Sequence, residues 1–357
     1  MKRCLLALVV CICLITSIAK AGTEPVKAKS DKIWGDNKKK LTYMEGHVRI
    51  EQGPTVITTE TTQVDLDKRI ATFENKLQLI SSDVIITADY LEYNFKSKVG
   101  TFLRNIILNR NEVKDTLGKV TKDGFKLSAE SLYFESDTKN FKVQNQGMVE
   151  HKDFIGTADL IEYNDKKQEL IFRGNAKIKR PSGEEINGNE VVINTQNRSI
   201  IVSGNVRLVN EDVTIVGENL NYDYHKNHGV FKSAIVLERA ETKNASGKVT
   251  KEHFKLTTVG LEFESDTKNF VTRSKARVEH KDFTGFADHI EYNDKQQQMK
   301  FVNNSYLKRP KGEEIRGDMI TIYINDKSFT VSNHVDINYK VNLNNENQTD
   351  KKRKRFP

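Results

Sequence analysis

Apolar and polar residues alternate in steps of two along most of this chain, and the alternation returns about every thirty residues. In the segment from Ala158 to Asp165, the apolar Ile161 and Tyr163 are separated and followed by Glu162 and Asn164. Alternation with a period of two places the apolar side chains on one face of a β-strand, and aliphatic and aromatic residue types agree with a strand. A polar turn follows at 164–167. The pattern therefore predicts short strands that each have one apolar face.

The segment from Ala158 to Asp165 returns almost unchanged as Ala287 to Asp294, so a long unit is duplicated in line. A shorter period lies inside the duplication. Its copies follow one another at nearly constant spacing, which widens only where the polar inserts 111–121 and 240–250 intervene. Their first residues are Ser30, Thr59, Ala88, Ala129, Ala158, Gly188, Gly217, Thr258, Ala287 and Gly317. Ten copies of one small unit thus fill residues 30–337.

Four positions of each copy carry most of its apolar side chains. In the fifth copy they are Ile161, Tyr163, Phe172 and Ile178, and the pair Gly174-Asn175 predicts a bulge between the last two. Ile33 of the first copy is equivalent to Ile161, and Ile337 of the last copy is equivalent to Ile178. One copy buries too little apolar surface to offset the entropy of ordering about thirty residues, whereas stacked copies share their apolar faces. The fold class predicted is therefore an all-β repeat array.

The two ends of the chain differ from the repeats. Basic residues at 2–3, an apolar run at 4–18 and Ala19-Lys20-Ala21 predict a signal peptide over residues 1–21, cleaved after Ala21 and followed by export; an uncleaved anchor is the alternative. We expect a mobile N-terminus over residues 22–29. Two repeat modules follow, at 30–174 and 175–337, and residues 338–357 are expected to form a disordered basic tail. All three cysteines precede residue 22, so the mature chain has neither a disulfide nor a thiolate metal site.

The formal charge of +8 does not describe the repeats. Three of the positive charges belong to the signal peptide and five to the run 351–355, so the repeat body is close to neutral. A basic face for nucleic acid is not expected. The tail is interpreted as a solvated chain end, with contact to phosphates of membranes or sugars as the alternative.

Catalytic and metal-binding motifs are absent from the sequence. His151 and His280 each lie in a Glu-His-Lys-Asp segment, which predicts an exposed edge with paired charges. The acidic or amide residues at the second position of most copies recur as a ladder, whereas an enzyme needs one constellation of carboxylates with different pKa values. We therefore predict no enzyme activity, no catalytic residue, no cofactor and no metal.

A column of Tyr and Phe residues leaves two interpretations open: a closed core, or a trough that accepts acyl chains, in which each buried CH₂ contributes about 0.8 kcal/mol. Basic residues at the rim of such a trough would meet phosphates; they are Lys179, Arg180, Lys308 and Arg309. The predicted lipid-binding residues are Leu91, Tyr93, Phe102, Leu108, Leu132, Phe134, Ile161, Tyr163, Phe172, Ile178, Leu220, Tyr222, Phe231, Ile290 and Tyr292.

The recurring pattern resembles the OstA-like domain of the LptA family of periplasmic lipopolysaccharide transport proteins. It reads Ala158-Asp159, then Tyr163, then 172–178, and it covers about residues 30–337 in an apparently duplicated form. The resemblance implies an elongated, twisted β-jellyroll with an open groove between two sheets. It also implies lipopolysaccharide as the ligand, which is carried between the inner and outer membranes with its lipid A acyl chains in the groove. The implied partners are an LptC-like inner-membrane anchor and an LptD-like outer-membrane translocon, joined by pairing of end strands, and other copies of the chain, stacked head to tail.

Three functions follow as hypotheses. The first is a non-catalytic periplasmic lipid conduit. The second is a structural or adhesive surface β-solenoid without a lipid ligand, and the third is a polysaccharide-active β-helix enzyme. Lipid crosslinks from inward positions would distinguish the lipid conduit from the structural solenoid. Saccharide turnover that is abolished by substitution of one carboxylate would identify the enzyme.

Overall fold

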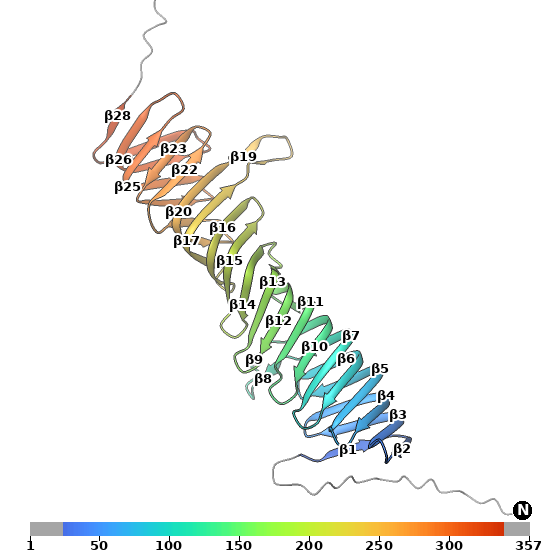
Figure 1. Ribbon diagram of the computed structural model, residues 1–357. Helices are drawn as coiled ribbons and strands as arrows, with labels where there is room; N and C mark the ends of the chain where they lie inside the picture. Colours follow the sequence, from blue (N-terminus) through green and yellow to red (C-terminus); the bar gives the residue numbers. More distant parts are fainter. Residues whose placement is uncertain (1–23, 339–357) are drawn as a thin grey trace, which may run out of the picture. The chain divides into compact units, whose positions relative to one another are not determined.

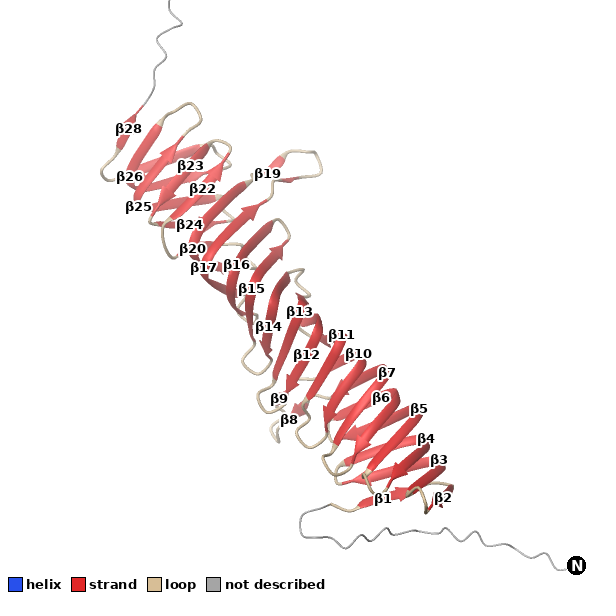
Figure 2. Ribbon diagram, in the orientation of Figure 1, coloured by secondary structure: helices blue, strands red, loops and turns tan. Residues whose placement is uncertain are grey.

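The computed structural model describes residues 24–338, whose regular structure consists of β-strands (Figures 1 and 2). Within this range there is no helix, and so no helical segment with the length and apolarity that crossing a membrane requires. The all-β prediction is confirmed. The predicted signal peptide and all of the predicted tail except Asn338 lie outside the described residues.

The chain divides into two compact units, one up to Val202 and one from Ser203, and β15 (Ser199–Asn210) includes the point of division. The strands of the first unit are β1 (Val26–Lys29), β2 (Lys32–Asp36), β3 (Leu41–Gln52), β4 (Thr55–Asp65), β5 (Ile70–Ser81), β6 (Val84–Asn94), β7 (Val99–Arg110), β8 (Val113–Lys114), β9 (Val120–Lys122), β10 (Phe125–Glu135), β11 (Phe141–His151), β12 (Phe154–Asn164), β13 (Glu169–Lys179) and β14 (Glu185–Asn194). The sequence predicted a division at 174/175, but these two residues lie inside β13, which pairs with β12 and β14 on both sides of them.

The second unit repeats this plan with more interruptions. Its strands are β16 (Val213–Asp223), β17 (His228–Arg239), β18 (Thr242–Lys243), β19 (Val249–Lys251), β20 (Phe254–Glu264), β21 (Phe270–Thr272), β22 (Ala276–His280), β23 (Phe283–Ala287), β24 (His289–Asn293), β25 (Gln298–Lys308), β26 (Glu314–Tyr323), β27 (Ser328–Ser332) and β28 (Asp336–Asn338). Here β21 with β22, and β23 with β24, take the places of single long strands.

In both units each long strand pairs antiparallel with the next one, so the chain runs as a meander. The long strands join at alternate ends, which gives each unit two rows of turns. The polar inserts form small separate hairpins, β8–β9 and β18–β19, within one of these rows. Each copy of the short repeat therefore supplies two strands and two turns.

A bend near the middle of each long strand is the feature that shapes the units. In β13 the register shifts between Arg173 and Ala176, where Gly174 and Asn175 have φ of +69° and +49°. The predicted bulge is confirmed. Asn is among the few residues other than Gly that tolerate this left-handed conformation. Equivalent shifts occur in β5 and β11, so the bends form a column along the unit.

The acidic residue at the second position of several copies stabilises this bend. The carboxylate of Asp159 accepts a hydrogen bond from Asn175 Nδ2 at 2.8 Å, sixteen residues later. The same spacing joins Asp89 to Asn105, Asp288 to Asn304, Asp31 to His47 and Asp318 to His334. The acidic ladder of the sequence is therefore a structural device at the bends.

The two halves of each bent strand enclose an apolar interior. Phe125 at the start of β10 contacts Tyr163 near the end of β12, with ring centroids 5.1 Å apart. Ile161, Phe172 and Ile178 are fully buried, as the alternating pattern predicted. The pattern fails in the terminal strands, where Ile33 and Ile337 are 42% and 38% exposed, because these strands have a neighbour on one side only. Mobility was predicted for 22–29, but Val26–Lys29 form β1, which pairs with β3.

Candidate functional site

All fifteen residues predicted to line a lipid trough point into the interior. Each has at most 4% of its surface exposed, including the four tyrosines. Ten of them, from Leu91 to Ile178, lie in the first unit, and five, from Leu220 to Tyr292, lie in the second. The sequence thus selected residues that share one environment in each unit. In this structure that environment is an enclosed interior lined by aliphatic and aromatic side chains.

The four predicted rim residues lie at two equivalent places, where β13 and β25 end and their following turns begin, and they differ in exposure. The side chain of Lys179 is 60% exposed and lies 3.9 Å from Glu185. Arg180 is nearly buried and forms an ion pair with Glu184. Arg309 pairs with Glu313 at 3.2 Å and lies over the ring of Phe329, whereas Lys308 is exposed. The lysines, more than the arginines, present their charge to solvent.

Polar contacts between the two rows of turns close the side of the interior opposite the bends. We call this boundary the seam. In the first unit Gln52 donates to the carbonyl of Phe95 at 2.9 Å, and Ser81 donates to the carbonyl of Ser136 at 3.3 Å. The Tyr93 hydroxyl shares a hydrogen bond of 2.8 Å with the Ser136 hydroxyl. In the second unit Asn210 and Tyr222 make the matching contacts to Ser265.

A buried ionic cluster lies on the seam of the first unit. Its centre is Arg110, whose side chain is fully buried at the end of β7. Arg110 donates to the Tyr163 hydroxyl at 2.7 Å, pairs with Asp165 and lies 3.1 Å from Asp83. Two lysines complete the first ionic cluster: Lys122 of the β8–β9 hairpin pairs with Asp165, and Lys139 pairs with Asp83.

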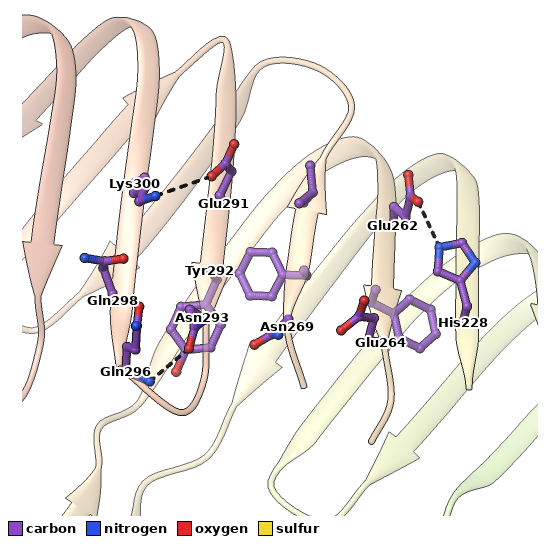
Figure 3. Close-up of a pocket in the computed structure, with 13 residues that line it drawn as sticks. His228, Glu262, Glu264, Asn269, Glu291, Tyr292, Asn293, Gln296, Gln298 and Lys300 are labelled. Carbon is purple, nitrogen blue, oxygen red and sulfur yellow. Dashed lines mark hydrogen bonds and ion pairs between the residues drawn. The ribbon is translucent and has the colours of Figure 1, made fainter. Parts of the chain in front are cut away.

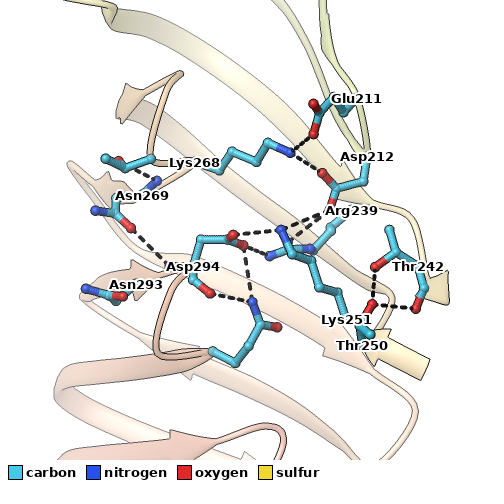
Figure 4. A network of polar contacts seen from close by, with 12 residues as sticks. Glu211, Asp212, Arg239, Thr242, Thr250, Lys251, Lys268, Asn269, Asn293 and Asp294 are labelled. Carbon is cyan, nitrogen blue, oxygen red and sulfur yellow. Dashed lines mark hydrogen bonds and ion pairs between the residues drawn. The ribbon is translucent and has the colours of Figure 1, made fainter. Parts of the chain in front are cut away.

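The second unit contains the same cluster at the equivalent positions of the duplication (Figure 4). Arg239, with 1% of its side chain exposed, pairs with Asp294, bonds to Tyr292 and lies 2.9 Å from Asp212. Lys251 of the β18–β19 hairpin is 2.7 Å from Asp294. In the same second ionic cluster, Lys268 is 2.6 Å from Asp212. Six side chains are thus kept in identity and in contact through the duplication.

Both clusters are held in their charged form. Burial alone would raise the pKa of Asp165, but hydrogen bonds from Lys122 and Arg110 outweigh burial and leave that pKa below its usual value. The pKa of Asp294 is lowered in the same way by Arg239 and Lys251. Burial raises the pKa of Tyr163 and of Tyr292, so both hydroxyls stay protonated. The clusters are therefore fixed charge networks at neutral pH.

The sequence interpretation did not identify these clusters, because Asp165 and Asp294 lie in turns that look solvent-exposed and the arginines precede polar inserts. The signal was present in the duplication, since each charged member and its tyrosine recur unchanged at the same offset. Charged residues kept in both copies of the duplication are candidates for mutual contact.

The expectation of an exposed edge at His151 and His280 is wrong. Their side chains are 0% and 3% exposed and stack on Phe154 and Phe283. In both rings Nδ1 accepts a hydrogen bond from the backbone two residues later, at 3.2 Å. Burial lowers the pKa of both histidines, so the neutral ring is favoured.

A surface depression of about 410 Å³ lies on the outer face of the second unit (Figure 3). Polar side chains from β17, β20, β24 and β25 surround it. They pair with each other: His228 lies 2.8 Å from Glu262, and Lys300 lies 4.0 Å from Glu291. These paired charges suit a solvated strand surface. The buried Phe263, Phe270 and Tyr292 also line the depression, so it borders the apolar interior.

The comparisons with known proteins agree with the repeat analysis. A family model described as LptA/(LptD N-terminal domain) LPS transport protein matches residues 26–199 and again residues 185–328. The chain belongs to this LPS transport family. Two successive matches to the LptA/LptD N-terminal family confirm the OstA-like domain in duplicated form that the sequence predicted.

The chain was also compared with curated proteins and with solved structures. No curated protein matches the chain. A matching solved structure is LptH from Pseudomonas aeruginosa, the LptA-homologous periplasmic component of the lipopolysaccharide transport device. It is 15% identical, with 52% of this chain and 94% of LptH covered and a TM-score of 0.17.

Proposed function

We propose that this member of the LptA/LptD N-terminal family is a non-catalytic carrier of lipopolysaccharide, with the acyl chains of lipid A in the interior and the saccharide outside. The observation that supports this proposal best is the column of buried aliphatic and aromatic side chains between the bends and the seam of each unit. Burial of acyl chains there is favourable by about 0.8 kcal/mol for each CH₂. The fifteen interior residues are the proposed lipid contacts.

Entry of a lipid requires the seam to open, because the interior is enclosed. The bends are covalently continuous strands, whereas the seam consists of side-chain contacts between turns. When the seam opens, water solvates the charged groups of the two clusters. The apolar interior then becomes accessible to an acyl chain. We therefore assign lipid entry to the seam. Lys179 and Lys308 remain the proposed phosphate contacts, since their charges face solvent.

The proposed location is the periplasm, after export and cleavage behind Ala21. The edge strands at the two ends of the described chain offer a route to partners. In the first unit β1 and β2 pair with β3 on one side, and in the second β27 and β28 pair with β26. A sheet edge binds a further strand through its main chain. An LptC-like anchor, an LptD-like translocon or a second copy of this chain are the partners proposed for these edges.

Photo-crosslinking from adjacent residues tests the proposal. A photoreactive aromatic amino acid replaces Phe102, which is fully buried, or Leu103, which faces outward and is partly exposed. We expect lipopolysaccharide adducts from position 102 and few from position 103. Equal adducts from both positions, or none from position 102, would refute the lipid-filled interior and favour the structural solenoid.

A further inference from the structure

A row of aromatic and cationic side chains crosses the outer face of the second unit; Arg277, Phe286 and Arg316 are exposed, and Tyr306 is half-buried. Arg277, Phe286, Tyr306 and Arg316 are direct neighbours on β22, β23, β25 and β26. The Phe286 and Tyr306 rings stack with centroids 6.0 Å apart. Arg277 lies over Phe286 at 5.6 Å, and Arg316 lies over Tyr306 at 4.8 Å. We call these four residues the aromatic row.

The aromatic row has no counterpart in the first unit. The equivalent positions of the duplication are Met148, Thr157, Lys177 and Asn187, which also align across neighbouring strands. The same backbone framework therefore carries an ordinary mixed surface in one unit and two aromatic rings between two arginines in the other. The stability of the framework does not require the row, because the first unit forms without it.

A pocket of about 490 Å³ adjoins the aromatic row where the strands of the second unit are interrupted. Arg277 and Phe286 belong to both the row and the pocket, and Thr257, Lys275, Asp288 and Asn304 contribute further lining. This volume is in the range of small-molecule sites. The lining also includes apolar side chains: Ala234, Val259, Ala276 and Ala287. Lys275 and Arg277 supply two cations, and Arg277 is paired with Glu279 at 3.0 Å, so a phosphate at Arg277 would replace that carboxylate. The pocket therefore suits a compact anionic group next to a flat apolar ring face.

The composition of this site favours a saccharide over a protein strand. The row lies inside the sheet. Both β23 and β25 are hydrogen-bonded to a strand on each side, so neither has a free edge to pair with the main chain of a peptide. Aromatic rings pack well against the C–H face of a sugar ring, with hydroxyl groups left to polar side chains at the edge. Arginine binds phosphate through a planar pair of N–H donors.

We infer that the aromatic row and the adjoining pocket bind a phosphorylated sugar of the lipopolysaccharide saccharide, outside the apolar interior of the same unit. The sugar ring stacks on Phe286 and Tyr306, and Arg277 and Lys275 contact its phosphate. The exposed Lys308 follows Tyr306 by two residues on the same face of β25. This inference rests on the proposed function, which supplies the saccharide as part of the cargo.

The test uses the soluble, phosphorylated oligosaccharide that remains when lipopolysaccharide is fully deacylated. Its binding to the full mature chain is followed by saturation-transfer and titration NMR. The variant Phe286→Ala/Tyr306→Ala is compared with the matched first-unit variant Thr157→Ala/Lys177→Ala. We expect the aromatic variant to lose about tenfold or more in affinity, the size of a stacking and cation–π contribution. The matched variant should keep the wild-type affinity, and removal of the phosphate should weaken binding.

Equal affinity of the two variants for the oligosaccharide would overturn the inference. Tight binding of the chain to anionic vesicles, without binding to the oligosaccharide, would also overturn it. Crosslinking from Phe102 in the aromatic variant separates this result from the proposed function. Adducts from position 102 without row-dependent oligosaccharide binding refute the saccharide site alone. Row-dependent binding without adducts from position 102 supports the saccharide site and refutes the lipid-filled interior.

Discussion

Single side chains at the bends show how a degenerate repeat keeps one backbone shape. The bend places Gly174 and Asn175 in a left-handed conformation, and the carboxylate of Asp159 holds the amide of Asn175 at 2.8 Å. The bulge and the acidic ladder are each visible in the sequence as separate features. The bond between them is not, because a hydrogen bond over sixteen residues depends on the strand register, which local pattern does not give.

Removal of this bond should have a modest effect on stability. We expect Asp159→Ala to reduce the free energy of unfolding by about 1 kcal/mol, the usual net value of one hydrogen bond. Urea unfolding measures the change. Lys166→Ala, which removes an exposed side chain in the β12–β13 turn, is the control and should be neutral. Equal effects of the two substitutions would show that Asp159 does not stabilise the bend.

Arg110 should be much more sensitive, because it neutralises two buried carboxylates. We expect Arg110→Met to reduce the free energy of unfolding by about 3 kcal/mol or more, since loss of one partner leaves uncompensated buried charge. Arg239→Met should do the same in the second unit. In the Arg110→Met background, Asp83→Asn/Asp165→Asn should restore part of the loss. A loss unchanged by the two asparagines would contradict the ionic explanation.

The buried histidines give stability a pH dependence. Burial lowers the pKa of His151 and His280 below the ordinary value of 6.5, so the unfolded chain binds protons before the folded chain does. Their contribution is complete above pH 6.5 and is lost as the pH falls from there through the folded pKa. We expect the thermal midpoint to decrease as the pH falls from about 6.5 towards the aspartate range near 4.

The variant His151→Phe/His280→Phe keeps the ring stacking and removes the titration. Its thermal midpoint should change less over the same pH interval than that of the wild type. The depressed pKa values of Asp165 and Asp294 act separately, because their contribution is lost only as the pH falls below about 4. A double variant with the full wild-type slope over the histidine interval would exclude the histidines as its cause.

At the scale of elements, the sequence predicted more about strands than about their connections. Period-two alternation located the strands and their inward faces, since burial of one face is a local property of each strand. It treated the inserts 111–121 and 240–250 as polar interruptions. Their hairpins carry Lys122 and Lys251 into the ionic clusters, a role set by contacts to turns 43 residues away. Such contacts depend on how the meander brings the two rows of turns together.

The seam predicts a specific crosslink between elements. Ser81 at the end of β5 donates to the carbonyl of Ser136 in the β10–β11 turn at 3.3 Å. Residues 22–357 contain no cysteine, so in a chain of these residues Ser81→Cys/Ser136→Cys should form one intramolecular disulfide under mild oxidation. Free-thiol titration and mass spectrometry measure its formation. A pair that links only different molecules would contradict the observed proximity of the two rows. A pair that stays reduced would show that the two Cβ atoms do not meet the geometry of a disulfide.

At the scale of the whole chain, duplication explains both what is shared and what differs. Each unit keeps an apolar interior, a seam and an ionic cluster, which are the parts required for the proposed lipid carrier. The second unit adds the aromatic row and the pocket beside it. The periodicity of the sequence could not separate an open trough from a closed core, because both need the same inward side chains. The structure shows an enclosed interior whose closing contacts are polar.

The most direct test of a lipid-filled interior reached through the seam combines the disulfide with crosslinking. Lipopolysaccharide adducts are quantified from a photoreactive residue at position 102 in Ser81→Cys/Ser136→Cys, before and after reduction. We predict few adducts in the oxidised protein, recovery after reduction, and no effect of oxidation on either single-cysteine variant. Adducts that form equally well in the oxidised and reduced double variant would contradict entry through the seam, and their absence in both states would contradict lipid in the interior.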